Sequence, residues 1–441
     1  MTVDVAVIGA GIHGASAAYH LARAGARVTV LERLTPAGGP TGLSSGVCRA
    51  YYTNPFLAEA ARDSIRMMAD FAEIGQGHDS GYRRTGLLYL HPPQDADEVA
   101  DNARRLNELD IAVDLYGADE LRREFPQFVL DDIGIGAFER DAGYADPAGT
   151  TAGMMAGAVA AGAAMRAHTT VNSLRERPAG GAVLELDAGE RLEAERLLIA
   201  AGPWTAPLAR HIGVELPLTV ERHLVATARL ERDDRIPFGH GDLVTGYYCR
   251  PEGTDHYLMG WTHAEPPVDP DNFDRTLHRE EELALINAVA RRYPALHEGE
   301  PRGGWASLYD VSPDWQPVIG EIADGVTVSY FEWVKNLSHI RFGRMQRRQE
   351  EAQQALLVGE LDRLLRETGT GLGLSERFKR DYIHGAGELE LVRSGLDDTM
   401  RTAYQSMREV WHGRKDVEDL RVAAYLVSIG RVAASYRSKG L

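Results

Sequence analysis

The stretch VDVAVIGAGIHG, residues 3–14, decides the fold of this chain. Its first part, Val3 to Ile8, is an apolar run of the kind that forms a buried parallel strand. A helix is predicted over Ala15 to Ala24, where Gly25 ends it, and a second strand over Val28 to Leu31. The expected order is therefore strand, glycine-rich turn, helix and strand.

Each glycine of the turn has its own physical role. Gly9 permits the tight turn, Gly11 lets a pyrophosphate approach the backbone, and Gly14 lets helix and strand pack closely. The start of the helix offers free N–H groups and a partial positive charge to phosphates. Glu32, at the end of the second strand, suits a ribose hydroxyl. The sequence predicts a dinucleotide site, in which His13 is a packing or solvent-side residue.

Composition limits the class of protein. The 441 residues suggest two or three domains, and 44% hydrophobic with 26% charged residues is typical of a globular protein. A net charge of −17 argues against binding to nucleic acid or to an anionic membrane. Two cysteines, Cys48 and Cys249, are too few for a disulfide framework or a four-thiolate metal site, so no metal is expected. With no long apolar run and no leader-like start, we expect a cytoplasmic location.

Further glycine-rich motifs follow in order. They are GGPTGLSSGVCR at 38–49, GYRRTG at 81–86, GYADP at 143–147, AAGPW at 200–204 and WASLYDVSPDWQPVIG at 305–320. Together with residues 1–33 they resemble the D-amino-acid oxidase-like FAD-dependent oxidoreductases, and within them the sarcosine oxidase β-subunit-like group. The resemblance covers about residues 1–322.

The resemblance implies an α/β architecture of two domains between which the chain crosses. A Rossmann-like FAD-binding domain would use 1–85 and 145–220 and be closed by about 316–331. An antiparallel-sheet substrate domain would use 86–144 and 221–315. The local patterns agree with this division, with a helix over Ala96–Leu109 and strands over Val183–Leu186 and Arg196–Ala200.

The implied chemistry is oxidation of an amine or amino acid. The substrate would lose a hydride to flavin N5, the resulting imine would hydrolyse, and oxygen or another carrier would take the electrons. Some relatives attach FAD through a cysteine, at the position where this chain has Ser307. A serine cannot form that thioether, so we expect non-covalent FAD. Cys48 is interpreted as a small buried hydrophobe.

Five residues are candidates for contact with the substrate. Arg49 would pair with a substrate carboxylate, or else serve phosphates or a surface ion pair. Tyr52 stands where some relatives have a second arginine, and Tyr309 lies in the last motif. Tyr247 is a substrate contact or a core residue, and His263 lies over the flavin or is structural. At Leu258 the sarcosine oxidase branch has a lysine. The expected cofactor contacts are Gly9, Gly11, Gly14, Glu32, Arg33, Ser44, Ser45, Gly46, Val171, Gly202, Trp204 and Gly320.

The end of the chain differs from this family. From GVTVSYFEWVKN at 325–336 onward it resembles the C-terminal part of the Glu/Leu/Phe/Val dehydrogenases, a likeness that covers about 323–441 and that would bring Ser329 near a glutamate side chain. We expect residues 325–330 to replace the family's last strand, a helix to begin near Glu332, and the helices of 332–441 to form a separate lobe or mediate self-association. The chain reads as a fusion, natural or artificial, with its junction near 320–326.

Three functions stay open on the sequence. The first is an FAD-dependent amino-acid or amine oxidoreductase. The second is an inactive or weakly active flavin domain joined to a helical interaction module. The third, favoured only by the C-terminal part, is an NAD-dependent glutamate dehydrogenase. A yellow purified protein supports the first, a colourless folded protein the second, and NAD-dependent glutamate turnover the third.

Overall fold

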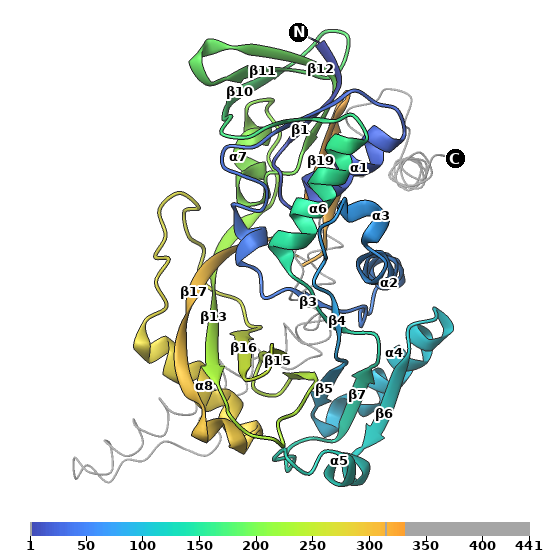
Figure 1. The fold of residues 1–441 in the computed structure, drawn as a ribbon, viewed down its shortest axis with the longest axis vertical. Coiled ribbons are helices and arrows are strands. Elements are labelled where there is room, and N and C mark those ends of the chain that lie inside the picture. Colours follow the sequence, from blue (N-terminus) through green and yellow to red (C-terminus); the bar gives the residue numbers. More distant parts are fainter. Residues whose placement is uncertain (1, 314, 331–441) are drawn as a thin grey trace, which may run out of the picture. The chain divides into compact units, whose positions relative to one another are not determined.

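A computed structural model describes residues 2–313 and 315–330 of the chain (Figure 1). The expectations for the C-terminal part, namely the helix beginning near Glu332, the separate helical lobe and self-association through it, lie outside the described residues. Two large sheets and a small one account for the strands that are described.

The first large sheet has the expected parallel centre. Strand β1 (Thr2–Ile8) lies between β2 (Val28–Leu31) and β12 (Arg191–Ile199), and both pairings are parallel. In this register Ile8 pairs with both Leu31 and Ile199, so three strands end at one edge, beside the glycine-rich turn. The other strands of this sheet are β9 (Ala164–Arg166), β10 (Val171–Glu176), β11 (Ala182–Leu186), β18 (Val318–Ala323) and β19 (Val326–Tyr330).

The prediction that residues 325–330 complete this sheet is confirmed. Strand β19 pairs in parallel with β12, with Val326 opposite Leu197 and Val328 opposite Ile199. Both valines are fully buried. The first half of β12 pairs with β11 and its second half with β19, so two different strands cover one edge of β12.

Helix α1 (Ile12–Arg23) begins three residues earlier than expected. The reason lies in Gly11, which is still extended at the N-cap, so the helix starts directly after the turn. Helix α6 (Pro147–Ala160) packs beside α1, and Figure 1 shows the two next to one another over the first sheet. Asp146 caps α6 by accepting a hydrogen bond from the N–H of Ala148.

The second large sheet is antiparallel at every pairing but one. Its order is β17 (Glu300–Val311), β13 (Thr219–Arg229), β16 (His256–Trp261), β15 (Tyr247–Glu252), β14 (Gly239–Asp242), β5 (Leu87–His91), β7 (Ile135–Glu139) and β6 (Val113–Gly117). The exception is the parallel pair of β5 with β14, where two segments far apart in the chain meet. Helix α8 (Arg279–Arg292) packs on β13, β16 and β17, and α4 (Ala96–Glu108), close to its predicted bounds, packs on β6 and β7.

Shorter elements connect these sheets. The small sheet consists of β3 (Val47–Cys48), β8 (Gly143–Tyr144) and β4 (Arg83–Arg84). The remaining helices are α2 (Pro55–Ala69), α3 (Ala72–Gly75), α5 (Ala118–Glu124), α7 (Thr205–Arg210) and the short 3-10 turns Pro40–Leu43, Pro93–Asp95, Asp187–Gly189, Gly202–Trp204 and Pro294–Glu298.

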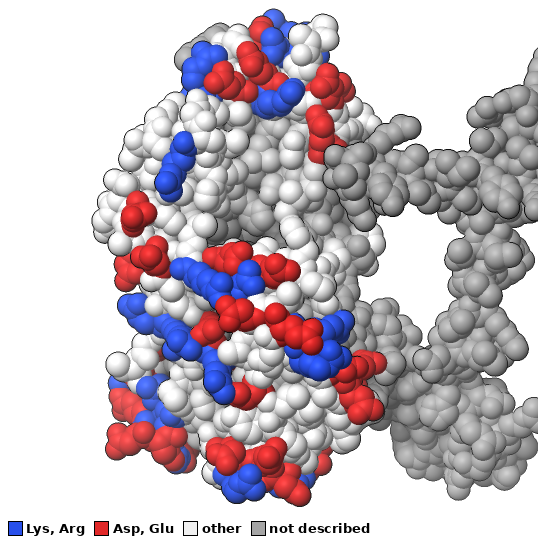
Figure 2. Space-filling model, turned by 90° about the vertical axis from the view of Figure 1, so that its right-hand side faces the viewer, with Lys and Arg blue, Asp and Glu red and all other residues white. Residues whose placement is uncertain are grey.

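Surface charges are interspersed on the face that Figure 2 shows, with acidic and basic side chains next to one another. Many exposed arginines form ion pairs, for example Arg122 with Asp119 and Arg104 with Asp101. Exposed pairs of this kind contribute little stability each. Within the described residues, no helix is both long enough and apolar enough to cross a membrane.

Candidate active site

A cavity of about 420 Å³ lies where residues of both large sheets meet. The first sheet contributes the turn after β1, the end of β2, the 200–204 turn and Ser329 of β19. The second sheet contributes the end of β17, from Ser307 to Asp310. Residues of the 38–46 loop, the start of α6 and the segment 169–171 also line it, as do Phe273 and Arg275.

The glycine-rich turn has the geometry that its sequence predicted. Gly9 has φ = +99°, which only glycine adopts easily, and a Cβ there would lie 2.3 Å from the carbonyl oxygen of Ala200. A Cβ on Gly14 would lie 1.9 Å from the carbonyl oxygen of Gly9. Gly11 lines the cavity, where a Cβ would meet the side chain of Thr41, with the hydroxyl at 2.9 Å. The turn is a cradle that side chains would fill.

Glu32 joins the turn to the end of β2. One carboxylate oxygen accepts a hydrogen bond from the N–H of Ala10 and the other from the N–H of Leu34, each at 2.8 Å. A carboxylate offers about four lone-pair positions, so both oxygens can still accept from a ligand hydroxyl. Glu32 lines the cavity and therefore suits the ribose role that its spacing predicted.

Arg33 and Trp204 form the wall beside Glu32. The guanidinium of Arg33 stacks on the Trp204 ring at 3.8 Å, and the indole N–H of Trp204 donates to Asp271 at 2.9 Å. Arg33 also pairs with Asp271 at 3.4 Å. Through Asp271, these contacts attach the loop that follows β16 to residues at the ends of first-sheet strands.

Nine of the twelve expected cofactor contacts line the cavity: Gly9, Gly11, Glu32, Arg33, Ser44, Gly46, Val171, Gly202 and Trp204. The other three do not. Gly14 acts from behind the turn, and the carbonyl of Ser45 accepts a hydrogen bond from Arg250 at 2.6 Å. Gly320 lies in β18 opposite Val328, and no atom would lie within 4 Å of a Cβ added to it.

The second-sheet wall carries the polar side chains best placed for a reacting substrate. Tyr309 lines the cavity and stacks on His223, with ring centroids 4.1 Å apart. The Nε2 of His223 lies 3.0 Å from a carboxylate oxygen of Glu221, and both side chains are buried. Ser307 lines the same wall, and its hydroxyl has no hydrogen-bond partner among the described residues.

Asp310 adds a carboxyl group to this wall. One oxygen has no hydrogen-bond partner among the described residues, and it would lie 4.0 Å from a Cβ on Gly202. Burial raises the pKa of Asp310 to about 7. The group can therefore gain or lose a proton near neutral pH.

Tyr247 and Tyr248 are adjacent in β15, so their side chains point to opposite faces of the sheet. Tyr247 points into the core, where its ring packs edge-on against His240 at 5.7 Å. Tyr248 points the other way, and a Cβ on Gly260 would lie 2.5 Å from its hydroxyl. Burial raises the pKa of Tyr248, while the neighbouring hydroxyls of Ser45 and Tyr309 act in the opposite direction. Tyr248 is the member of the pair that lies beside Tyr309.

Arg49 and Tyr52 are buried and do not line the cavity. Arg49 donates to the carbonyl of Tyr51 at 3.2 Å, and its guanidinium lies 4.4 Å from the ring centre of Tyr52. Near this arginine, Glu139 accepts hydrogen bonds from the N–H of Ala50 at 2.6 Å, the N–H of Tyr51 at 3.2 Å and the hydroxyl of Tyr89 at 2.8 Å. Burial raises the pKa of Glu139 to about 7, and Arg49 opposes that shift.

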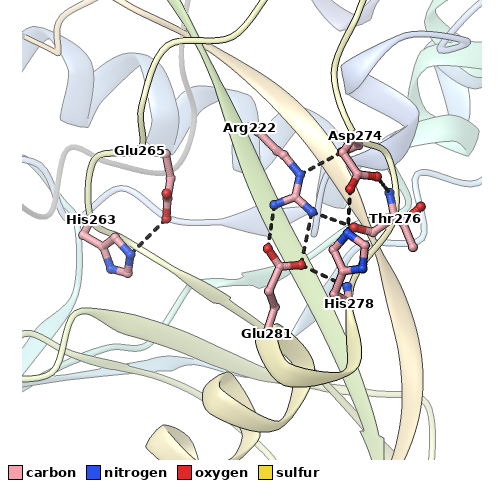
Figure 3. A network of polar contacts seen from close by, with 7 residues as sticks. All are labelled: Arg222, His263, Glu265, Asp274, Thr276, His278 and Glu281. Atoms are coloured by element: carbon pink, nitrogen blue, oxygen red, sulfur yellow. Dashed lines mark hydrogen bonds and ion pairs between the residues drawn. The ribbon is translucent and has the colours of Figure 1, made fainter.

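His263 and Cys48 have clear surroundings. His263 is half-buried and its Nε2 lies 3.0 Å from a carboxylate oxygen of Glu265, as Figure 3 shows; it does not line the cavity. Cys48 is buried, as expected, and burial raises the pKa of its thiol to about 12, so the thiol stays neutral.

The lining or neighbouring residues that were not among the candidates include His13, Tyr248, Arg275 and Asp310. His13 was expected to be a packing or solvent-side residue, and it lines the cavity. Asp310 directly follows Tyr309 in the last motif, so its position was the one signal in the sequence. Side chains alternate between the two faces along β15, so only one tyrosine of the pair can lie beside Tyr309, but the sequence does not tell which one.

A family model described as FAD dependent oxidoreductase matches residues 4–341. The chain belongs to this family of flavoproteins and uses FAD. The match runs about twenty residues beyond the expected end of the resemblance near 322, and it includes β19. The cradle, Glu32 and the cavity fit the dinucleotide that this membership requires.

Relatives of the chain act on small amines, by their names. Monomeric sarcosine oxidase of Streptomyces avermitilis is 27% identical over 359 residues, which covers 74% of this chain and 88% of that protein. The crystal structure of glycine oxidase from Geobacillus kaustophilus superposes with a TM-score of 0.66 at 22% identity, covering 77% of this chain and 92% of that one, and supports the fold.

A second likeness is short. The mitochondrial glutamate dehydrogenase of Dictyostelium discoideum is 43% identical over 118 residues, 27% of this chain. This chain spans only 22% of the length of that dehydrogenase.

Proposed function

We propose that this FAD-dependent oxidoreductase oxidises the C–N bond of an amino acid or a secondary amine of the sarcosine or glycine type. The observation that carries the proposal is the shared cavity, which joins the dinucleotide cradle of the first sheet to the wall of Tyr309 and Asp310 on the second. Bound FAD supplies the oxidising power, by accepting a hydride from the carbon next to the substrate nitrogen. The electron acceptor in turn is oxygen or another carrier.

The residues of the chain bind the cofactor, contact the substrate and exchange a proton with it. The FAD-binding domain comprises residues 1–85 and 145–220 and is closed by 316–331; its cradle and Glu32 hold the dinucleotide. The substrate domain comprises 86–144 and 221–315 and contains the second sheet. Tyr309, held by His223, offers its ring and hydroxyl to the substrate. Asp310 exchanges a proton with the substrate amine, because a pKa of about 7 suits transfer near neutral pH.

The other candidate residues do not contact the substrate directly and have positioning or structural roles. The burial of Arg49 and Tyr52 supports a positioning role, in which they hold the segment that follows the 38–46 loop. The core position of Tyr247 and the ion pair of His263 support structural roles. FAD is held without a covalent bond, because the side chain at position 307 is a hydroxyl, which cannot form a thioether.

The experiment starts with the visible spectrum of the purified protein. We expect flavin absorption, release of all flavin into the supernatant on acid precipitation, and anaerobic bleaching by an amine of the sarcosine or glycine series. Flavin that remains in the pellet contradicts non-covalent binding. A yellow protein that no amine bleaches contradicts the amine-oxidising function, and NAD-dependent glutamate turnover would replace it.

A further inference from the structure

An arginine side chain at the cavity wall can bind an anionic group of the ligand, so the cavity arginines indicate which anion binds there. Within the described residues there are two, Arg33 and Arg275. Arg33 is occupied by Trp204 and Asp271. The guanidinium of Arg275 has no hydrogen bond or ion pair with any described residue, and its nearest aromatic contact is the Phe273 ring, at 5.4 Å. Arg275 is therefore an exposed cation at the cavity wall that no described residue pairs with.

The backbone around Arg275 is clamped from both sides. Arg222 of β13 donates to the carbonyl of Asp274 at 2.7 Å and to the carbonyl of Thr276 at 2.6 Å, the residues before and after Arg275. The same guanidinium makes two hydrogen bonds to Glu281 of α8, at 2.9 and 3.2 Å. Figure 3 shows Arg222 at the centre of this network.

Further contacts close the network. The side chain of Asp274 accepts from the N–H of Thr276 at 2.8 Å and lies 2.6 Å from His278, whose N–H donates to Glu281 at 2.9 Å. The carbonyl of Arg275 accepts from the N–H of Ala306, one residue before the cavity-lining Ser307. The backbone of Arg275 is thus fixed on the substrate wall, while none of its side-chain donors is used by a described residue.

We infer that Arg275 binds the carboxylate of the substrate and so selects amino acids over simple amines. The inference rests on the proposed function, whose substrate class it narrows. Guanidinium presents a planar fork of donors that matches a carboxylate. The competing arginines are occupied or buried: Arg49 packs on Tyr52, and Arg250 is bound to the carbonyl of Ser45. Tyr52, at the place where some relatives have an arginine, carries no charge.

The other anion that could use Arg275 is the pyrophosphate of the cofactor. The start of α1 and the cradle at Gly9 and Gly11 already serve a pyrophosphate, from the opposite sheet. Arg275, in contrast, is attached through Ala306 to the wall that carries Tyr309. The position on the second sheet favours the substrate carboxylate.

The test measures equilibrium binding, so it does not depend on turnover. The flavin spectrum of the holoenzyme is titrated with (methylthio)acetate and with its uncharged amide. In Arg275→Gln we expect the Kd of the acid to rise ~10- to 100-fold, the loss typical of a charge-assisted pair, while the Kd of the amide changes less than about twofold. Arg275→Lys keeps the charge but not the fork and should fall between. Arg302→Gln, which removes an exposed arginine of β17, the strand to which the Arg275 backbone bonds, is the matched control and should leave both values unchanged.

Three results overturn the inference. The first is an unchanged Kd of the acid in Arg275→Gln, and the second is failure of the acid to bind the wild-type protein. The third is loss of FAD from Arg275→Gln while the Kd of the acid stays unaltered; this result would assign Arg275 to the pyrophosphate. A wild-type protein that binds the acid through Arg275 but oxidises no amine leaves the inference standing and refutes the proposed function.

Discussion

His13 Nδ1 lies 2.9 Å from the hydroxyl of Ser329, so the helix that follows the glycine-rich turn contacts the last described strand, β19. Both residues line the cavity. Burial lowers the pKa of His13 to about 4, which keeps the ring neutral at pH 7. The contact is therefore a hydrogen bond between neutral groups, and it holds β19 against the cofactor cradle.

Ser329→Ala removes this hydrogen bond. A neutral hydrogen bond contributes about 0.5–1.5 kcal/mol, so we expect FAD to bind about two- to tenfold more weakly, as measured by fluorescence titration of the apoprotein. Thr327→Ala, in the same strand but not lining the cavity, is the control. Equal effects of the two substitutions would show that Ser329 serves only the strand.

Gly14→Ala places a methyl group where the carbonyl oxygen of Gly9 lies, 1.9 Å away. The turn must move, so we expect the flavin content of the purified protein to fall at least tenfold. Gly320→Ala is the matched control, because its Cβ would meet nothing within 4 Å. Loss of flavin from the Gly320 variant would restore the role that the sequence predicted for that residue.

The two neighbouring tyrosines of β15 should respond differently to loss of a hydroxyl. Tyr248→Phe removes a group beside Tyr309 and Ser45, and we expect a changed kcat/KM with an unchanged melting temperature. Tyr247→Phe removes a buried hydroxyl that has no hydrogen-bond partner among the described residues, so stability should be equal or higher and catalysis unaffected. Steady-state kinetics and thermal melts of both variants decide, and a reversed pattern would contradict the assignment of the two faces.

Glu139 should make stability depend on pH. Its folded-state pKa is about 7, above its ordinary value of 4.5, so the folded protein keeps a proton that the unfolded chain has lost between these values. The contribution of this group to the free energy of unfolding is complete below about pH 4.5 and falls as pH rises through 7. In Glu139→Gln, which cannot ionise, we expect less stability at acid pH but a smaller loss between pH 4.5 and 7.5. Urea unfolding at both pH values checks this, and an equal loss in the two proteins would refute it.

Local signals account for what the sequence predicted well. The turn at 9–14, the strands beside it and the strand at 326–330 follow from glycine positions and apolar runs, which act over a few residues. The cavity wall depends on long-range register instead. Whether Tyr247 or Tyr248 lies beside Tyr309 depends on which side of β15 is covered by α8 and its neighbours, and a short sequence window does not contain that information. The burial of Arg49 likewise depends on Glu139, ninety positions away in β7.

The pairing of β12 with both β1 and β19 also fixes the order of events during synthesis. Strand β12 leaves the ribosome before its partner β19, which begins about 130 residues after β12 ends. At the usual 5–20 residues per second this is a delay of ~6–25 s. Until then the edge of β12 next to Leu197 and Ile199 has exposed, unpaired backbone groups that could pair with another chain. A newly made chain that stops before Val326 should therefore aggregate or require a chaperone, although nearly all of its cavity residues are already present.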